Sequence, residues 1–288
     1  MARIQASCWL MLMLCTVQLS ALADDINYSG EVSLATDSNL NNAWRDKDVR
    51  EDNMLTAVVT ASVPYKLSAS SGLLFSAGLH SEWHQNFSGT DFVAAKLAAA
   101  YRFRMGRRFS SPAYTLGVSV RERASSSVIR DSTTLDAKLE MFMRITELTS
   151  VIAGVAWSQE EAEGDVFDQS RGRFYANMDV LLAASSTVFL TYLYVTGDVA
   201  SVGTADSLTL LRAASALEPD DAFGDGSVTG ALAYRLDATT HILNLGYNRA
   251  FDHHSSLDVS LRWLNSAAGL GIDYQSLVLR VGYLFQFE

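Results

Sequence analysis

The side chains best suited to chemistry in this sequence recur at every second position. His80, Glu82 and His84 form one such set, and closely spaced imidazole and carboxylate groups can bind a metal ion or transfer protons. Guanidinium groups, which bind carboxylates and phosphates, follow the same spacing in three pairs: Arg102 and Arg104, Arg121 and Arg123, Arg171 and Arg173. A β-strand sends alternate side chains to one face, so strands are the elements that would position these sets.

Alternation of apolar and polar residues runs through most of the chain. In the last such segment the large apolar residues are Leu277, Leu279, Val281, Tyr283, Phe285 and Phe287. The same pattern predicts strands over 26–36, 54–67, 72–84, 93–104, 114–123, 135–145, 150–160, 173–182, 187–197 and 257–263. Strands of about 10–14 residues exceed the usual length in soluble sheets and match a tilted crossing of a lipid bilayer.

The segments between these strands alternate in length. Short polar connections are expected at 68–71, 106–111, 146–149 and 184–186, and long charged ones at 37–53, 125–133, 160–170 and 200–225. Short turns at one rim and long loops at the other are typical of outer-membrane barrels. Within 234–251 the apolar face changes parity near residues 240–243, which predicts one long strand with a β-bulge. The strand count is then about twelve, an even number as in bacterial barrels.

The first residues predict a secretory signal peptide. Arg3 precedes a short apolar run, and Ala21-Leu22-Ala23 forms a small-x-small cleavage site directly before two aspartates. Residues 1–23 are therefore expected to be removed, leaving 24–288 as the mature chain; a buried helix is the alternative. Both cysteines lie in the signal, which excludes disulfides and a cysteine nucleophile from the mature chain. The net charge of −10 does not suggest a surface that binds nucleic acid.

The carboxyl end resembles the assembly signal of Gram-negative outer-membrane β-barrels. The matching pattern is Arg280-x-Gly282-x-x-Phe285-x-Phe287, and Glu288 after the final aromatic residue departs from it. Near the other end, Gly30-x-Val32-x-Leu34-x-x-Asp37-Ser38-Asn39 resembles the opening strand of several proteobacterial barrels. The resemblance implies insertion by the barrel-assembly machinery, with Gly282, Phe285 and Phe287 as signal residues. Outer-membrane lipid and lipopolysaccharide would then surround the protein.

If the strands close into a barrel, their polar faces line its lumen. The basic side chains expected to point inward are Lys96, Arg102, Arg104, Arg121, Arg123, Lys138, Arg144, Arg171, Arg173, Arg262 and Arg280. The acidic ones are Glu31, Glu82, Asp136, Glu140, Asp179 and Asp258. An excess of positive charge in a confined aqueous space would favour anions. The alternative is that these groups pair with one another and fill a narrow lumen that conducts poorly.

The histidines are interpreted as hydrated lumen or rim residues rather than as a metal or catalytic site. Same-face neighbours on a strand lie about 6.6 Å apart, so His80, Glu82 and His84 could hardly all bind one ion. The same interpretation applies to His253-His254 in a short connection. A lipid hydrolase would need serine and histidine together on one outward surface, whereas Ser81 points away from its histidine neighbours.

Residues 206–217 depart from the strand pattern. Asp206 can cap a helix, leucines follow at helical spacing, and Pro219 would end it. Two placements are open for this predicted helix in the longest loop: inward as a constriction, or over the rim.

Together these patterns predict an all-β protein, a single antiparallel transmembrane β-barrel of about twelve strands in the outer membrane. The expected function is a small porin or export channel for anionic or sugar-like solutes through an arginine-rich lumen. No cofactor, metal or nucleic acid is expected. A structural or surface-interaction barrel that conducts little is the alternative, followed by a lipid-modifying enzyme.

Overall fold

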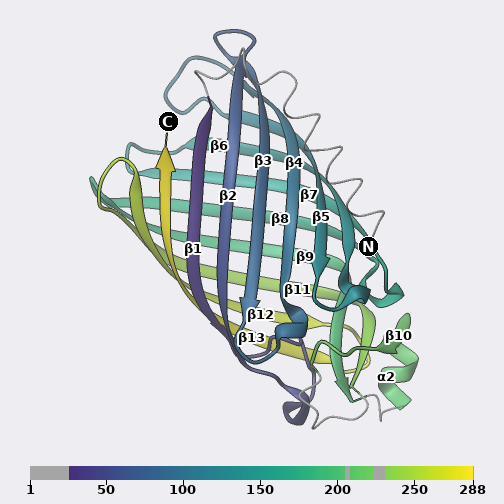
Figure 1. The fold of residues 1–288 in the computed structure, drawn as a ribbon. Helices are drawn as coiled ribbons and strands as arrows, with labels where there is room; N and C mark the ends of the chain where they lie inside the picture. Colours follow the sequence, from purple (N-terminus) through teal and green to yellow (C-terminus); the bar gives the residue numbers. More distant parts are fainter. Residues whose placement is uncertain (1–25, 205–207, 224–230, 288) are drawn as a thin grey trace.

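The alternating segments form long antiparallel strands that wrap around a central lumen (Figure 1). The computed structural model describes residues 26–204, 208–223 and 231–287. The predicted signal peptide at 1–23, the helix cap Asp206 and Glu288 lie outside these ranges. Within them, no helix has the length and apolar character that crossing a membrane would require.

Twelve strands form the barrel, and a short additional strand, β10 (Ala216–Pro219), pairs with the first residues of β11 (Ala231–Ala250), which lie beyond the pairing of β11 with β12. The barrel strands are β1 (Asn27–Asp37), β2 (Asp52–Lys66), β3 (Ser71–His84), β4 (Phe92–Arg104), β5 (Ala113–Ser125), β6 (Ser132–Arg144), β7 (Thr149–Ala162), β8 (Gln169–Ala183), β9 (Ser186–Thr204), β11 (Ala231–Ala250), β12 (Ser255–Ala267) and β13 (Asp273–Phe287). Neighbours along the chain pair with each other, β9 pairs with β11, and β1 pairs with β13 to close the sheet. The predicted fold and strand count are confirmed.

The outward faces of the strands carry the predicted apolar side chains. Leu34 is 64% exposed, Leu79 60% and Leu279 53%, and each is one of the regularly alternating apolar residues of its strand. A soluble sheet would bury such a face against another layer. Here the closed sheet has no free edge and leaves the apolar face outside, which is the arrangement that lipid requires.

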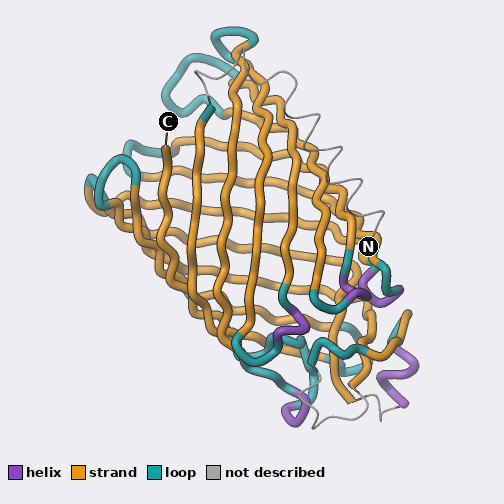
Figure 2. Tube along the Cα trace, viewed as in Figure 1, coloured by secondary structure: helices purple, strands orange, loops and turns teal. Residues whose placement is uncertain are grey.

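The two ends of the barrel differ in the length of their connections. At one end the turns at 67–70, 145–148, 184–185 and 251–254 have four residues or fewer, and 105–112 is longer. All described helical segments lie at the other end (Figure 2). They are η3 (Asp46–Asp48), η4 (Ser88–Thr90), η5 (Val128–Arg130), η6 (Asp165–Phe167) and α2 (Leu208–Ala213). The expected asymmetry of connections is therefore present, and we refer to the two ends as the short-turn end and the long-loop end.

The β9–β11 pair extends beyond its neighbours at the long-loop end. Pairing with β8 stops at Gly197 and pairing with β12 stops at Thr239, whereas β9 and β11 stay paired up to Thr204 and Ala231. The expected loop at 200–225 is therefore partly strand. Two long strands can continue past the membrane because they satisfy each other's backbone hydrogen bonds.

The predicted β-bulge at 240–243 is wrong. The register between β9 and β11 is continuous from Ala231 to Arg249, and the described irregularity lies instead at the turn of β8, between Leu181 and Ala183. The apolar side chains change parity because Tyr234 and Leu236 stand beyond the lipid-facing belt. They pack with Leu210 and Ile272, so their burial comes from loops rather than lipid.

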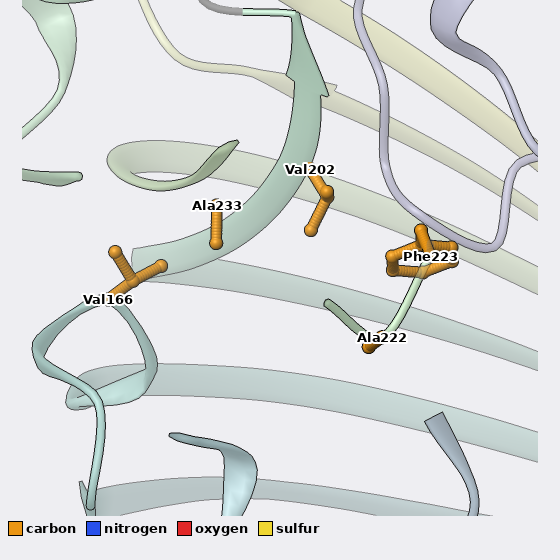
Figure 3. Packing of buried hydrophobic residues seen from close by; sticks show 5 residues of the cluster. All are labelled: Val166, Val202, Ala222, Phe223 and Ala233. Atoms are coloured by element: carbon orange, nitrogen blue, oxygen red, sulfur yellow. The ribbon is translucent and has the colours of Figure 1, made fainter. Parts of the chain in front are cut away.

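A second apolar cluster covers the other face of the β9–β11 extension, and we call it the apolar plug. It consists of Val166, Val202, Ala222, Phe223 and Ala233, all buried, which come from the β7–β8 and β10–β11 connections and from β9 and β11 (Figure 3). Leu40 and Phe87 from two further connections pack against it. Several separate stretches of chain thus meet at the long-loop end.

The helix predicted over 206–217 is shorter in the structure. Only Leu208–Ala213 is helical, and Ala216–Pro219 pairs with β11. The Ser215 backbone N–H donates to the carbonyl oxygen of Arg235, so strand pairing replaces the last helical turn. Leu210 is fully buried and packs this segment against Tyr234, Leu236 and Ile272 at the long-loop end, which agrees with the predicted placement over the rim rather than inside the lumen.

Candidate functional site

Four strands, β4, β5, β6 and β8, direct basic side chains into one cavity of about 780 Å³ inside the barrel, and β7 lines it with smaller residues. The basic residues that line it are Lys96, Arg102, Arg121, Lys138, Arg171 and Arg173. Lys96 lies directly opposite Arg121 in the strand register. Small residues such as Ala98, Gly117 and Ser158 stand between the long side chains and leave the space open.

A second chamber of about 490 Å³ lies toward the long-loop end and shares Arg121, Arg171 and Arg173 with the first. Arg123 from β5 and Arg130 from η5 add two further basic groups. We call the eight basic residues of the two chambers the basic wall: Lys96, Arg102, Arg121, Arg123, Arg130, Lys138, Arg171 and Arg173. The acidic residues lining the same chambers are Asp136, Glu140 and Glu160, which leaves an excess of positive charge.

Ion pairs neutralise part of the basic wall. Arg173 Nη2 lies 2.5 Å from Asp136 Oδ1, and Arg171 Nη2 lies 2.9 Å from Glu160 Oε2. Lys138 Nζ lies 3.3 Å from a Glu140 carboxylate oxygen, and that carboxylate also accepts the Tyr175 hydroxyl. For these residues, the mutual pairing considered as an alternative from the sequence is present.

Four other members of the basic wall, Lys96, Arg102, Arg121 and Arg123, make no ion pair within the described residues, whereas Arg130 pairs with Asp220. The Arg121 Nη2 group donates to Thr134 Oγ1 at 3.1 Å, and Arg123 Nε donates to Ser125 Oγ at 3.0 Å. Lys96 and Arg102 likewise have no acidic partner in the described chain. The Nε atoms of Arg121 and Arg173 are buried and without a hydrogen-bond partner there. Lys96, Arg102, Arg121 and Arg123 therefore line the two chambers without an acidic partner in the described chain.

Four of the predicted selectivity residues lie apart from the basic wall. Arg104 and Arg144 end their strands at the short-turn rim, and Arg144 lies 5.6 Å from the Phe109 ring centre. Arg262 faces inward on β12 but lines neither chamber. Arg280 on β13 pairs with Glu31 and, at 3.1 Å, with Asp258. The lumen is therefore positively charged mainly along β4 to β8.

The connection between β1 and β2 forms part of the roof over the second chamber. Two hydrogen bonds join Asn41 to Val202. The Asn41 side-chain Nδ2 donates to the Val202 carbonyl oxygen at 2.8 Å, and the Val202 backbone N–H donates to the Asn41 carbonyl oxygen at 2.9 Å. Asp48 Oδ1 accepts the Thr204 hydroxyl at 2.6 Å. Since β9 stands well away from β1 and β2 in the strand order, this connection crosses the mouth of the barrel.

Arg130 and Glu160 are chamber residues that the sequence analysis missed. Glu160 ends the predicted strand 150–160 and has the inward parity of β7, so applying that parity to the last residue of the strand would have found it. Arg130 lies in a connection without periodicity, and its place in the lumen depends on contacts with distant segments.

The side chains of the histidine set contact neighbouring residues of β3 and β4 and of the connection between these strands. His84 Nδ1 lies 3.3 Å from Asp91, its Nε2 lies 3.4 Å from Glu82, and His80 packs edge-on against Phe92. No cluster of three or more metal-ligating side chains occurs among the residues that the structure describes. The outward-facing His241 accepts or donates a 2.8 Å hydrogen bond with the Tyr192 hydroxyl. In the described chain no serine is hydrogen-bonded to a histidine side chain.

The carboxyl-terminal pattern lies on the last barrel strand. Gly282 faces the lumen beside Arg280, whereas Phe285 and Phe287 project outward with ring centres 5.5 Å apart. The Phe285 ring covers Gly30 on β1 so closely that a Cβ at residue 30 would lie 2.1 Å from it. The two terminal strands are therefore joined by a ring that needs glycine opposite.

No protein-family model matches the sequence, and no curated protein matches it. Among solved structures, an outer-membrane channel from Pseudomonas putida F1 superposes with a TM-score of 0.54 at 12% identity, over 91% of this chain and 96% of that one. The chain has the fold of an outer-membrane channel. With its apolar outer belt, this fold places the protein in the outer membrane.

More distant similarities are to other outer-membrane proteins. The KdgM porin in complex with disordered oligogalacturonate has a TM-score of 0.46 at 10% identity, over 90% of this chain and 99% of that chain. An anion-selective porin from Comamonas acidovorans has a TM-score of 0.44 at 8% identity, over 91% and 98%.

Proposed function

We propose that this barrel is a channel for small anionic or sugar-like solutes, which move along the basic wall. The excess of basic over acidic residues in the two joined chambers carries this proposal. Lys96, Arg102, Arg121 and Arg123 have no acidic partner in the described chain, and a cation in a confined lumen raises the local concentration of anions. The fold shared with an outer-membrane channel supports a transport role.

Hydroxyl groups beside the basic wall support saccharides as part of the solute class. Ser119, Thr134, Ser158 and Tyr175 line the larger chamber together with the arginines. A sugar acid offers a carboxylate for the guanidinium groups and hydroxyls for these side chains. The wall therefore suits solutes that combine both kinds of group.

Planar-bilayer recording of the purified mature protein tests this proposal. In a salt gradient we expect the sign of the reversal potential to show that anions pass more readily than cations. Added sugar acids should reduce the chloride current, because they compete with chloride for the basic wall. Cation preference, or a folded protein that passes no current, would contradict the proposal.

A non-conducting structural or surface-interaction barrel is the second candidate. The apolar plug and the crossing connection at 38–51 favour it, because both cover the mouth at the long-loop end. A heat-modifiable, correctly folded protein without conductance under any tested solute would support this alternative.

We also propose that residues 1–23 direct secretion and that Gly282, Phe285 and Phe287 are recognised by the barrel-assembly machinery. The outward position of the two phenylalanines on the last strand supports this role. The apolar belt would then contact phospholipid on the periplasmic side and lipopolysaccharide on the outer side. Export of a Phe287→Ala variant to the outer membrane, compared with a Phe251→Ala control in a turn, tests the assembly signal.

A further inference from the structure

Arg130 belongs both to the chamber and to the contacts that hold the plug. Its guanidinium lines the second chamber, and its Nη2 lies 2.6 Å from Asp220 Oδ2. The Arg130 side chain is 12% exposed and the Asp220 side chain 0%. The Arg130 Nε atom is buried and has no hydrogen-bond partner in the described chain. One nitrogen of this cation thus holds a loop, while another nitrogen of the same guanidinium has no partner in the described chain.

Asp220 begins the segment 220–223, which ends at Phe223 in the apolar plug. Next to it, Asp221 Oδ1 accepts the Ser127 hydroxyl at 2.7 Å. The Ala222 backbone packs closely on Gly89, since a Cβ atom at residue 89 would lie 2.4 Å from Ala222 Cα. Segment 220–223 precedes β11, yet its partners lie on the β3–β4 and β5–β6 connections, so it reaches across the mouth.

The aromatic contacts place Arg130 directly beneath the plug. Its guanidinium carbon lies 4.5 Å from the Phe167 ring centre and 5.4 Å from the Phe223 ring centre. A displacement of this side chain would therefore remove the ion pair to Asp220 and a contact of Phe223 at once. Arg121 and Arg123 approach the same chamber from β5, so an anion that enters it is drawn toward Arg130.

We propose that the Arg130–Asp220 pair is a latch opened by the transported anion. This inference rests on the proposed function, since it assumes that anions reach the second chamber. An anion bound to Arg130 replaces the Asp220 carboxylate as its partner, and a buried carboxylate without its cation is strongly destabilised. Hydration of Asp220 then draws segment 220–223 and Phe223 out of the mouth. The anion stabilises the open state because it binds Arg130 better there.

A cysteine within the plug reports on opening without requiring conductance. Val202 on β9 is 3% exposed, packs in the same cluster as Phe223 and borders the second chamber. The mature chain expected after cleavage has no cysteine of its own. In Val202→Cys protein in micelles, a bulky maleimide should label the cysteine slowly. Saturating citrate or inorganic phosphate should raise the labelling rate about tenfold, a typical size for coupling between ligand binding and a conformational change. Uncharged glucose should not accelerate it.

Asp220→Asn in the same background removes the charge that the latch needs. We expect fast labelling without anion and no further increase when anion is added. The matched control Asp237→Asn, an exposed carboxylate on β11, should behave as the parent. Anion-independent labelling in the parent, or an Asp220→Asn variant that matches it, would overturn the latch.

A crosslink separates failure of the latch from failure of the channel. Ser127→Cys with Asp221→Cys should form a disulfide that keeps the mouth closed, so that current appears only after reduction. Combined with Val202→Cys, the intact disulfide should also abolish the rise in labelling at position 202 that anions cause. Full conductance with the disulfide intact would refute the latch and leave the channel standing. Labelling that responds to anions without any current would retain the latch and refute the channel.

Discussion

Two single substitutions in the basic wall should change ion selectivity in opposite directions. Arg121→Gln removes a positive charge that has no acidic partner in the described chain. Asp136→Asn removes the negative charge that lies 2.5 Å from Arg173 and so frees that guanidinium. We expect the preference for anions to fall in the first variant and to rise in the second.

The size of the effect follows from Coulomb's law. A unit charge about 6 Å from a passing anion contributes about 0.7 kcal/mol in water and about 2.8 kcal/mol at an effective dielectric constant of 20. Hydrated walls lie nearer the first value, and salt screens the interaction further. Since about 1.4 kcal/mol corresponds to a factor of ten, the anion-to-cation permeability ratio should change by about three- to tenfold.

Reversal potentials in a salt gradient measure this ratio. Arg262→Gln is the matched control, because it removes the same charge from an inward-facing residue that lines neither chamber. It should shift the ratio much less than Arg121→Gln, and higher ionic strength should weaken both effects. Equal shifts in the two arginine variants would mean that overall lumen charge, rather than the basic wall, sets selectivity.

Three further outcomes concern stability and titration. Arg280→Gln leaves two lumenal carboxylates unpaired and should lower the unfolding temperature measured on heat-modifiability gels. Unlike Arg121→Gln, it should not shift ion selectivity. Gly30→Leu should displace the Phe285 ring and destabilise closure by about 1–3 kcal/mol, measured by urea unfolding in micelles. Hydrogen bonds from His254 and Ser255 lower the pKa of the Asp252 carboxyl, so at a pH above the ordinary pKa of aspartate they stabilise the 251–254 turn. This stabilisation should be lost as the pH falls through the lowered pKa of the folded protein. An NMR titration that gives Asp252 a pKa at or above the ordinary value would contradict this expectation.

The barrel and the faces of its strands were predictable from the sequence. Whether Leu279 or Arg280 points to lipid is set by parity, because successive side chains on a strand alternate irrespective of what pairs with it. The same local rule identified every member of the basic wall except Arg130 before any contact was known. It also placed Phe285 and Phe287 on one face of the last strand.

The partners of those side chains were decided by the tertiary structure. Arg173 meets Asp136 across 37 residues of sequence, and only the register of three strands brings the two groups together. The parity change in β11 was visible in the sequence, but its cause was not, because Tyr234 and Leu236 are buried by Leu210 and Ile272 from other segments.

The mouth of the barrel belongs wholly to the tertiary structure. Ser127 and Asp221 are 94 residues apart, and neither lies in a periodic segment. Connections have no repeating geometry, so their contacts depend on where the barrel places their ends. Alternation between neighbouring residues therefore determined what faces lipid and what faces water, whereas the closed sheet decided which charges meet and which loops cover the lumen.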